Sequence, residues 1–358
     1  MDITNVKIGE REKNAKRSHV VVNELQCKHI PSSPLKALDT FKELAKLMDE
    51  KYKDERVLCV GFAETATAIG FEVARYHGWD YLPTTREVFN EDFIYFEESH
   101  SHATEQKLLR VDFSKYDRVV FVEDEVTTGN TIRHIIDLLE KENHKLKFAI
   151  ASILNDMTSE IIEKFEKSGI NIYYLLSINP YHLHDDVDSY IVDGDYISCK
   201  AHTCSHKVHD RKNVLQEVRL GVDPNSYNGN FVSLMASTLL RLKTLSKEDK
   251  ILVIGTEEFM YPAIRLGAKL EKYGYNVKCH STTRSPICTS KTESNYPLHT
   301  RYQLPSCYDS ERVTYIYDLD AYDKVLILTD GTDMVGISSL CLALELAGNT
   351  NISIYQFK

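Results

Sequence analysis

Two neighbouring acids and a run of small polar residues stand between an apolar segment and a predicted helix. Glu123 and Asp124 directly follow the apolar residues 119–122, and a helix is expected over residues 132–141. If the apolar segment is a buried strand of a parallel sheet, its carboxyl end holds the acids where α/β proteins bind ligands. Before the helix, the loop contains Thr127, Thr128, Gly129, Asn130 and Thr131.

This loop has the groups that a dianionic phosphate needs. Hydroxyls and backbone N–H groups at the start of a helix lie at its positive end, where they attract anions and donate hydrogen bonds to them. Acids beside such a site would repel the same ligand unless they hold other parts of it. Glu123 and Asp124 could bind the hydroxyl groups of a ribose, or Asp124 could hold a magnesium ion.

A second loop has related chemistry. Gly61 ends an apolar segment and allows a phosphate to approach the backbone closely, while Thr65 adds a hydroxyl near the next helix start. Glu64 is unusual beside a phosphate and is a second candidate magnesium ligand. After the following strand, Arg86 could clamp phosphate oxygens in a bidentate way. An ordinary turn between strand and helix, and a surface arginine paired with Glu87, are the plainer alternatives.

Two further pairs of residues are candidates for chemistry. His100 and His102 lie in a polar segment with the composition of a lid, where either could give a proton or a charge to a leaving group. A metal pair or solvated loop residues are the alternatives. Lys28 and His29 precede Pro31 and form a basic pair that would favour a ligand with a carboxylate or carbonyl. A surface turn is the alternative there.

The second half of the chain repeats the first. Strand-like and helix-like segments alternate in both halves, which indicates parallel sheets. We therefore predict the α/β class, with two related parallel-sheet domains over residues 1–180 and 225–358 and a polar linker region over 181–224. Four matches support this: 57–61 with 251–255, the helix ends at Gly78 and Gly274, 82–86 with 280–284, and 116–124 with 322–330.

The repeated half departs from the first where the ligand groups would lie. Asp330 alone replaces the acid pair, the Thr-Thr-Gly run is missing, and Asp333 stands near the expected phosphate position. We expect that this half does not bind a sugar phosphate in the same way. Its best polar anchors for another ligand are Thr283, Arg284 and Ser285.

Composition limits the classes of function. The 358-residue chain has a formal charge of −10, which argues against nonspecific binding to nucleic acid or to anionic membranes. No apolar run is long enough to span a bilayer, and the eight scattered cysteines favour a reduced, cytoplasmic protein. One cysteine- and histidine-rich stretch is either a zinc site or a polar linker. Its donors are Cys199, His202, Cys204, His206 and His209.

The motifs also resemble a known family. The Glu-Asp-x-x-Thr-Thr-Gly core at 123–129 resembles the phosphoribosyl-pyrophosphate (PRPP) signature of type I phosphoribosyltransferases. Residues 281–286 resemble the Thr-Arg-Ser-Pro string of the TRSP domain. That domain follows a phosphoribosyltransferase-like domain in proteins of bacterial tellurite-resistance-associated biosynthetic gene clusters. Residues 14–17, 28–31 and 98–103 look similar to that family as well.

The resemblance implies a first domain of type I phosphoribosyltransferase fold that uses PRPP and magnesium. Such an enzyme, a pentosyltransferase, joins ribose 5-phosphate to a nitrogenous, base-like acceptor, or runs the reverse reaction, in a nucleotide-like pathway. Glu123 and Asp124 would hold the ribose, residues 127–131 the 5′-phosphate, and residues 61–67 with Arg86 the pyrophosphate. The segment with Lys28 and His29 would form a hood that selects the acceptor, and the loop with His100 and His102 a lid over PRPP.

Two alternatives stay open at this point. The first is a noncatalytic module that senses PRPP or a nucleotide. The second, a PRPP synthetase, is less favoured because there the C-terminal copy carries the signature. For the oligomeric state, a homodimer is the hypothesis to be tested.

Overall fold

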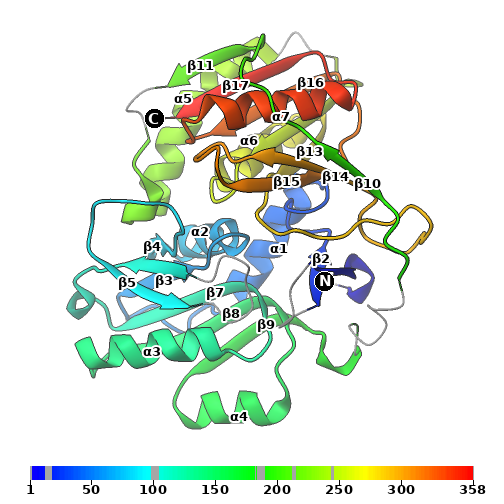
Figure 1. The fold of residues 1–358 in the computed structure, drawn as a ribbon. Coiled ribbons are helices and arrows are strands. Elements are labelled where there is room, and N and C mark those ends of the chain that lie inside the picture. Colours follow the sequence, from blue (N-terminus) through cyan, green and yellow to red (C-terminus); the bar gives the residue numbers. More distant parts are fainter. Residues whose placement is uncertain are drawn as a thin grey trace. The chain divides into compact units, whose positions relative to one another are not determined.

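The computed structural model describes residues 2–12, 18–97, 105–181, 183, 190–211, 215–242 and 246–357. The chain divides into two compact units, and each is described by itself (Figure 1). Unit 1 consists of residues 1–3, 39–182 and 216–228, and unit 2 of residues 4–38, 183–215 and 229–358.

Unit 1 is built on a five-stranded parallel sheet. In sheet order its strands are β4 (Asp80–Pro83), β3 (Val57–Gly61), β7 (Arg118–Val126), β8 (Lys147–Asn155) and β9 (Asn171–Ser177). Numbered along the chain this order is 2-1-3-4-5, in which the sheet is extended first to one side of β3 and then to the other. Strand β3 is buried along its whole length, as expected for a parallel strand covered on both faces.

Helices cover both faces of this sheet. Helix α2 (Ala66–His77) packs on one face, and α3 (Asn130–Glu142) and α4 (Ser159–Lys167) lie on the other (Figure 1). Helix α3 buries Ile132, Ile135, Ile136 and Leu139, whose spacing forms one apolar stripe. A hairpin of β5 (Phe93–Glu97) and β6 (Glu105–Leu109) completes the larger elements of unit 1.

Unit 2 repeats this arrangement. Its main sheet is parallel in the order β13 (Asn276–Ser281), β12 (Lys250–Gly255), β16 (Lys324–Thr329), β17 (Ile352–Phe357) and β11 (Lys207–Arg211). Along the chain, the first four follow the same 2-1-3-4 order as in unit 1, so the prediction of an internal repeat is confirmed. The fifth place is taken by β11, which precedes the repeat in the sequence. The predicted α/β class with two related parallel sheets is confirmed as well.

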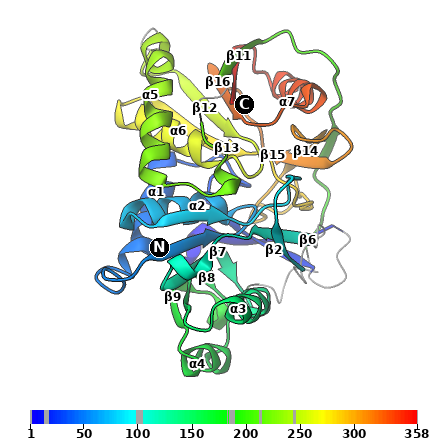
Figure 2. The same ribbon diagram turned by 90° about the vertical axis from the view of Figure 1, so that its left-hand side faces the viewer.

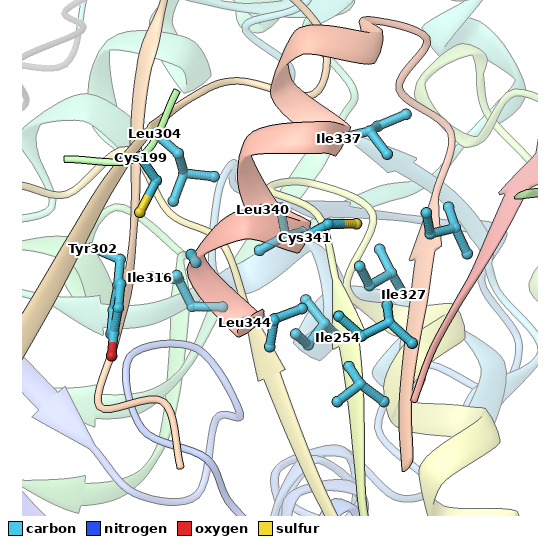
Figure 3. Close-up of a cluster of buried hydrophobic side chains, with 14 of the residues drawn as sticks. Cys199, Ile254, Tyr302, Leu304, Ile316, Ile327, Ile337, Leu340, Cys341 and Leu344 are labelled. Carbon is cyan, nitrogen blue, oxygen red and sulfur yellow. The ribbon is translucent and has the colours of Figure 1, made fainter. Parts of the chain in front are cut away.

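Helices α6 (Tyr261–Lys272) and α7 (Met334–Leu346) lie on opposite faces of the second sheet (Figure 2). Helix α7 also packs on a small sheet of β10 (Asp195–Ser198), β14 (Thr300–Pro305) and β15 (Val313–Tyr317). Its buried side chains, among them Ile337, Leu340, Cys341 and Leu344, form the core between the two sheets (Figure 3). The other helices of the described residues are α1 (Pro34–Lys46), α5 (Pro224–Leu242) and the 3-10 turns Ile3–Asn5, Phe113–Lys115, Asn179–Tyr181 and Val218–Leu220.

The compact units differ from the boundaries expected from the sequence. The hairpin of β1 (Val6–Glu10) and β2 (His19–Asn23) belongs to unit 2, where Val20 and Val22 pack with Tyr296 and Tyr317. Residues 183–215, expected as a polar linker, supply β10 and β11 to unit 2. None of the helices in the described ranges is long and apolar enough to cross a membrane.

Candidate functional site

The two acids lie within β7 rather than after it. We expected the strand to end at Val122, but it continues through Glu123 and Asp124 to Val126. Strand β8 is nine residues long and offers hydrogen-bonding partners over this stretch, with Glu123 opposite Ser152 and Val126 opposite Asn155. Both acids are partly exposed. The carboxylates are therefore held on a paired backbone at the carboxyl edge of the sheet.

The loop after β7 leads into an open helix N-terminus. Gly129 takes the position before α3 with a φ of 69°, and no side chain caps the first turn of that helix. Asn130 N–H makes a long hydrogen bond to Thr128 Oγ1 (3.4 Å), and the next N–H groups of α3 have no side-chain cap within the described residues. Thr127, Thr128 and Thr131 are partly exposed and Asn130 is exposed. The structure brings together every residue that the sequence predicted for a phosphate loop.

Gly129 is required by packing as well as by its backbone conformation. A Cβ atom at this position would lie 2.7 Å from Cζ of Phe165 on α4. The loop therefore rests on α4, and a cavity of about 400 Å³ opens beside it between α3 and α4. Thr128, Asn130 and the basic residues Arg133 and Lys164 are among the residues that line this cavity.

The loop after β3 brings a second helix N-terminus to the same edge of the sheet. Thr65 precedes α2, and no side chain caps that helix either. Glu64 and Thr65 are partly exposed, and the peptide bond between Ala63 and Glu64 is cis. Gly61 is needed for packing, because a Cβ there would lie 2.8 Å from both Ala66 O and Tyr81 Oη.

Two buried residues that we did not predict fix this second loop. The Thr84 hydroxyl accepts a hydrogen bond from Ala63 N–H (2.8 Å) and donates one to Gln106 Oε1 (2.7 Å). Gln106 Nε2 in turn donates to Ala63 O (3.0 Å). Neither has a spacing signal in the sequence: Thr84 lay in the Thr-Thr-Arg string as a neighbour of the arginine, and Gln106 in the polar lid.

Arg86 and Lys107 lie in the two segments that the hydrogen bond between Thr84 and Gln106 joins. Arg86 is half-buried and comes after Thr85, whose backbone exchanges two hydrogen bonds with Lys107 (2.8 and 3.1 Å). The Lys107 ammonium lies 4.7 Å from the centre of the Phe93 ring, a cation–π distance. The two candidate lid histidines, His100 and His102, lie outside the described residues.

Asn155 is a third residue that the sequence reading missed. It ends β8, beside the end of β7, and its side chain is fully buried. Within the described part of the chain, neither Nδ2 nor Oδ1 of Asn155 has a hydrogen-bonding partner. A buried amide with unmade hydrogen bonds is costly, so a native structure that keeps one has a reason for it.

Magnesium would find few protein ligands here. No three His, Cys, Asp or Glu side chains of the described ranges gather into a metal-binding group. Magnesium usually keeps several waters and binds through one or two carboxylates plus the phosphates of a substrate. The partly exposed Glu123 and Asp124 fit that mode of binding, and they do not fit a closed protein cage.

Lys28 and His29 lie in unit 2 and are buried. The Lys28 ammonium donates hydrogen bonds to Glu257 O (3.1 Å) and Thr282 O (3.0 Å). These contacts join the N-terminal segment to the loops that follow β12 and β13. The role of Lys28 and His29 in acceptor binding stays a prediction.

In unit 2, a protein carboxylate caps the helix that corresponds to α3. Asp333 caps this helix and accepts hydrogen bonds from Val335 N–H (2.9 Å) and Gly336 N–H (3.3 Å). Burial works to raise the pKa of Asp333, but the hydrogen bonds from Gly336 and Ser310 hold that pKa below its ordinary value. The corresponding helix of unit 1, α3, has no such cap.

A second carboxylate of unit 2 lies against two arginines. Glu257 follows β12 and is fully buried; its Oε2 lies 2.7 Å from Arg284 Nε and 3.1 Å from an Arg312 nitrogen. Arg284 is the repeat equivalent of Arg86. In unit 2, protein carboxylates therefore contact both the start of α7 and Arg284.

The Thr-Thr-Arg string has the same structural role in both units. Thr282 accepts a hydrogen bond from Glu257 N–H (3.0 Å), as Thr84 does from Ala63. Thr283 pairs with a strand through its backbone and is buried, while Ser285 N–H donates to the Thr283 hydroxyl (3.2 Å). A ligand anchored at Thr283, Arg284 and Ser285 stays a prediction.

The side chains of the cysteine- and histidine-rich stretch contact different neighbours. Cys199 is buried in the core around α7, His206 Nε2 lies 2.7 Å from Glu345 Oε1, and His209 stacks on the Tyr355 ring. Cys204 contacts another thiol, Cys341. The donors proposed for zinc thus have other neighbours in this structure.

Comparison with protein families bears on both halves of the chain. Residues 6–177 match the family model for phosphoribosyl transferases, and residues 216–338 match the TRSP domain that lies C-terminal to it. The chain has the phosphoribosyltransferase–TRSP architecture. The resemblance read from the sequence is thereby confirmed. A comparison with curated proteins found no match.

Similar solved structures include purine phosphoribosyltransferases. The adenine phosphoribosyltransferase of Rhodothermus marinus is 12% identical, with 48% of this chain and 94% of that chain covered and a TM-score of 0.36. The Trypanosoma brucei enzyme, in complex with AMP, pyrophosphate and ribose-5-phosphate, is 14% identical, with 49% and 77% covered and a TM-score of 0.36. A hypoxanthine phosphoribosyltransferase of Staphylococcus aureus is 17% identical, with 36% of this chain and 67% of that chain covered and a TM-score of 0.26.

Proposed function

We propose that the phosphoribosyltransferase domain is an active, magnesium-dependent enzyme that uses PRPP. It would transfer ribose 5-phosphate to a nitrogenous acceptor, or run the reverse reaction, in a nucleotide-like pathway. One observation carries the proposal: the N-terminus of α3 is open beside the acids of β7, whereas its counterpart α7 is closed by Asp333. This contrast between two equivalent helices supports a phosphate ligand at α3, because an uncapped helix start leaves N–H groups for an anion.

Each group in unit 1 has a role in this reaction. The first turn of α3 and the hydroxyls of residues 127–131 would hold the 5′-phosphate, and Glu123 and Asp124 the ribose hydroxyls. The loop from Gly61 to Thr65, with Glu64 and Arg86, would face the pyrophosphate. A bound magnesium ion would neutralise charge on the leaving pyrophosphate.

The bond changes follow from these positions. An acceptor nitrogen attacks C1 of the ribose as the bond from C1 to pyrophosphate breaks, and the acceptor then loses a proton. The transition state carries positive charge on the sugar, so nearby carboxylates stabilise it. His100 and His102 are our candidates for protonating the leaving group or for stabilising its charge.

The decisive experiment is Asp124→Asn, read by PRPP binding and by turnover. Loss of the carboxylate should weaken PRPP binding in the presence of magnesium more than tenfold, or about 1.4 kcal/mol. Isothermal titration measures the affinity, and release of pyrophosphate with a panel of nitrogenous bases measures turnover. Asp137→Asn is the matched control, because Asp137 lies on α3 and pairs with Arg133 instead. Equal affinity and turnover in Asp124→Asn and the parent would refute the assignment.

The same experiment separates an enzyme from a sensor. PRPP binding that needs Asp124 but gives no pyrophosphate with any acceptor would identify a noncatalytic, PRPP-sensing module. The homodimer that we named for testing stays a prediction, and light scattering of the purified chain measures it directly.

A further inference from the structure

The segment between β10 and β11 follows α7 and is held to it by polar contacts at two points. Ala201 N–H donates a hydrogen bond to Ser339 Oγ (2.9 Å), and His206 Nε2 lies 2.7 Å from Glu345 Oε1. Both contacts lie within unit 2. They keep residues 201–206 in place along the helix.

Between these two points lie two thiols. Sγ of Cys204 is 3.3 Å from Sγ of Cys341, although the residues are 137 positions apart in the chain. Cys341 is buried among the apolar side chains of α7 and the second sheet (Figure 3), whereas Cys204 is partly exposed. Cys204 is therefore the more accessible residue of the pair, and Cys341 lies in the core against which Cys204 packs.

The surroundings of Cys204 favour its thiolate. The hydrogen bond between the two sulfurs lowers the pKa of Cys204 below that of an ordinary thiol. The backbone N–H of His206 adds a second hydrogen bond to the same sulfur, and burial opposes both. A thiolate is the form of cysteine that reacts with oxidants.

We propose that Cys204 and Cys341 form a redox-active pair that a hydroperoxide converts to a disulfide. The Cys204 thiolate attacks the peroxide, so that an S–O bond forms, the O–O bond breaks, and the departing oxygen takes up a proton. Cys341 then attacks the Cys204 sulfenic acid, its thiol proton leaving with the hydroxide as water. The two thiols lose two electrons in total, and hydrogen peroxide becomes two molecules of water.

The product would tie residues 201–206 covalently to α7. A disulfide needs its sulfur atoms about 2.0 Å apart, so the observed pair must approach further before the bond can form. Cys204 lies in a connection between two strands, where such a movement disturbs no sheet pairing.

A second pair of neighbouring cysteines serves as a control for the effect of proximity alone. Cys27 and Cys279 also interact with each other in unit 2, but both are fully buried, and burial raises the pKa of Cys279 well above its ordinary value. This second pair is not accessible, and its Cys279 thiolate is disfavoured. It should therefore stay reduced under conditions that oxidise Cys204 and Cys341.

The test treats the reduced full-length chain with stoichiometric hydrogen peroxide. Remaining thiols are then blocked with a maleimide under denaturing conditions, and peptides are identified by mass spectrometry. We expect a cross-linked peptide that contains Cys204 and Cys341, reversed by dithiothreitol, with Cys27 and Cys279 both blocked. Full blocking of Cys204 and Cys341, or equal oxidation of both pairs, would overturn the proposal.

Variants test the order of the steps. Cys341→Ser should leave Cys204 as a sulfenic acid that dimedone traps, and Cys204→Ser should leave Cys341 reduced. Because Cys341 is buried, circular dichroism must first show that each variant is folded; Cys204→Ser alters a partly exposed residue and keeps the test available if Cys341→Ser fails. Oxidation of Cys341 in Cys204→Ser, at the rate seen in the parent, would contradict Cys204 as the attacking thiol.

Discussion

At the scale of single residues, Asn155 has the most informative side chain in unit 1. Its amide is buried at the end of β8, opposite Val126 at the end of β7, and its hydrogen bonds are unmade within the described residues. An amide offers one acceptor and two donors, which suits the polar edge of a nitrogenous acceptor. We therefore expect that Asn155 is retained for a ligand at the expense of stability.

Asn155→Leu should separate these two effects. Removing the unsatisfied amide should raise the free energy of unfolding by about 1 kcal/mol, measured by urea denaturation. PRPP affinity should stay unchanged, while transfer to the acceptor falls at least tenfold. Ser152→Ala is the control, because the Ser152 hydroxyl is also buried without a hydrogen bond among the described residues. A more stable Asn155→Leu variant with full activity would show that the amide has no ligand.

The sequence predicted reactive residues better than the residues that position them. Glu123, Asp124 and the loop 127–131 lie at the carboxyl edge of the sheet as expected, since their order along the chain already places them after a buried segment. Thr84 and Gln106 escaped prediction because their partners are 21 and 43 positions away at Ala63. Contacts over such distances leave no local pattern.

At the scale of elements, the two related domains differ in how their helices begin. Helix α7 starts with a side-chain cap from Asp333, and α3 starts with Gly129 and no cap. The sequence predicted a helix over residues 132–141, and the structure begins it two residues earlier, at Asn130. The extent of β7 was not predicted, because a strand ends where its partner stops offering hydrogen bonds, and β8 offers them as far as Asn155.

Gly129→Ala tests the loop as an element. The φ of 69° should cost about 1 kcal/mol with an alanine, and the new Cβ would also press on the Phe165 ring. We expect lower stability and a loss of PRPP affinity of tenfold or more, measured by titration. Gly169→Ala is the matched control: its φ is 77°, but its Cβ would meet no atom within 4 Å.

The Gly169→Ala control separates the backbone effect of the substitution from its effect on the ligand. Gly169→Ala should lose the same backbone contribution to stability and keep its affinity for PRPP. If Gly129→Ala binds PRPP as tightly as Gly169→Ala does, the conformation of the loop does not matter for the ligand.

At the scale of the whole molecule, the two units are not consecutive in the sequence as the repeat suggests. We predicted a first domain over residues 1–180, yet residues 4–38 group with unit 2. Glu10 N–H donates to Tyr296 Oη (2.7 Å), a contact across 286 positions. The repeat predicted two sheets correctly, because periodicity is local. It could not assign the N-terminal hairpin, because the apolar residues of β2 would suit any sheet.

This assignment predicts what happens to a fragment of residues 1–228. The fragment keeps all of unit 1 but removes most of unit 2, including Glu257 and Thr282, whose carbonyls hold the Lys28 ammonium. Without these partners the segment 4–38 should unfold locally, and local unfolding exposes a chain to proteases. We expect trypsin to cleave after Lys28 more than tenfold faster in the fragment than in the full chain, as measured by timed digestion and mass spectrometry.

Arg118 supplies the internal control for that digestion. It is buried at the start of β7, where it pairs with Glu55 and donates a hydrogen bond to Phe148 O (2.9 Å), all within unit 1. Cleavage after Arg118 should therefore be slow in both proteins, and fast cleavage there would show that the fragment as a whole has unfolded. Because unit 1 has its own buried sheet, we expect the fragment to protect Arg118 and lose only Lys28. Equal protection of Lys28 in the fragment and the full chain would mean that residues 4–38 are held by unit 1 after all.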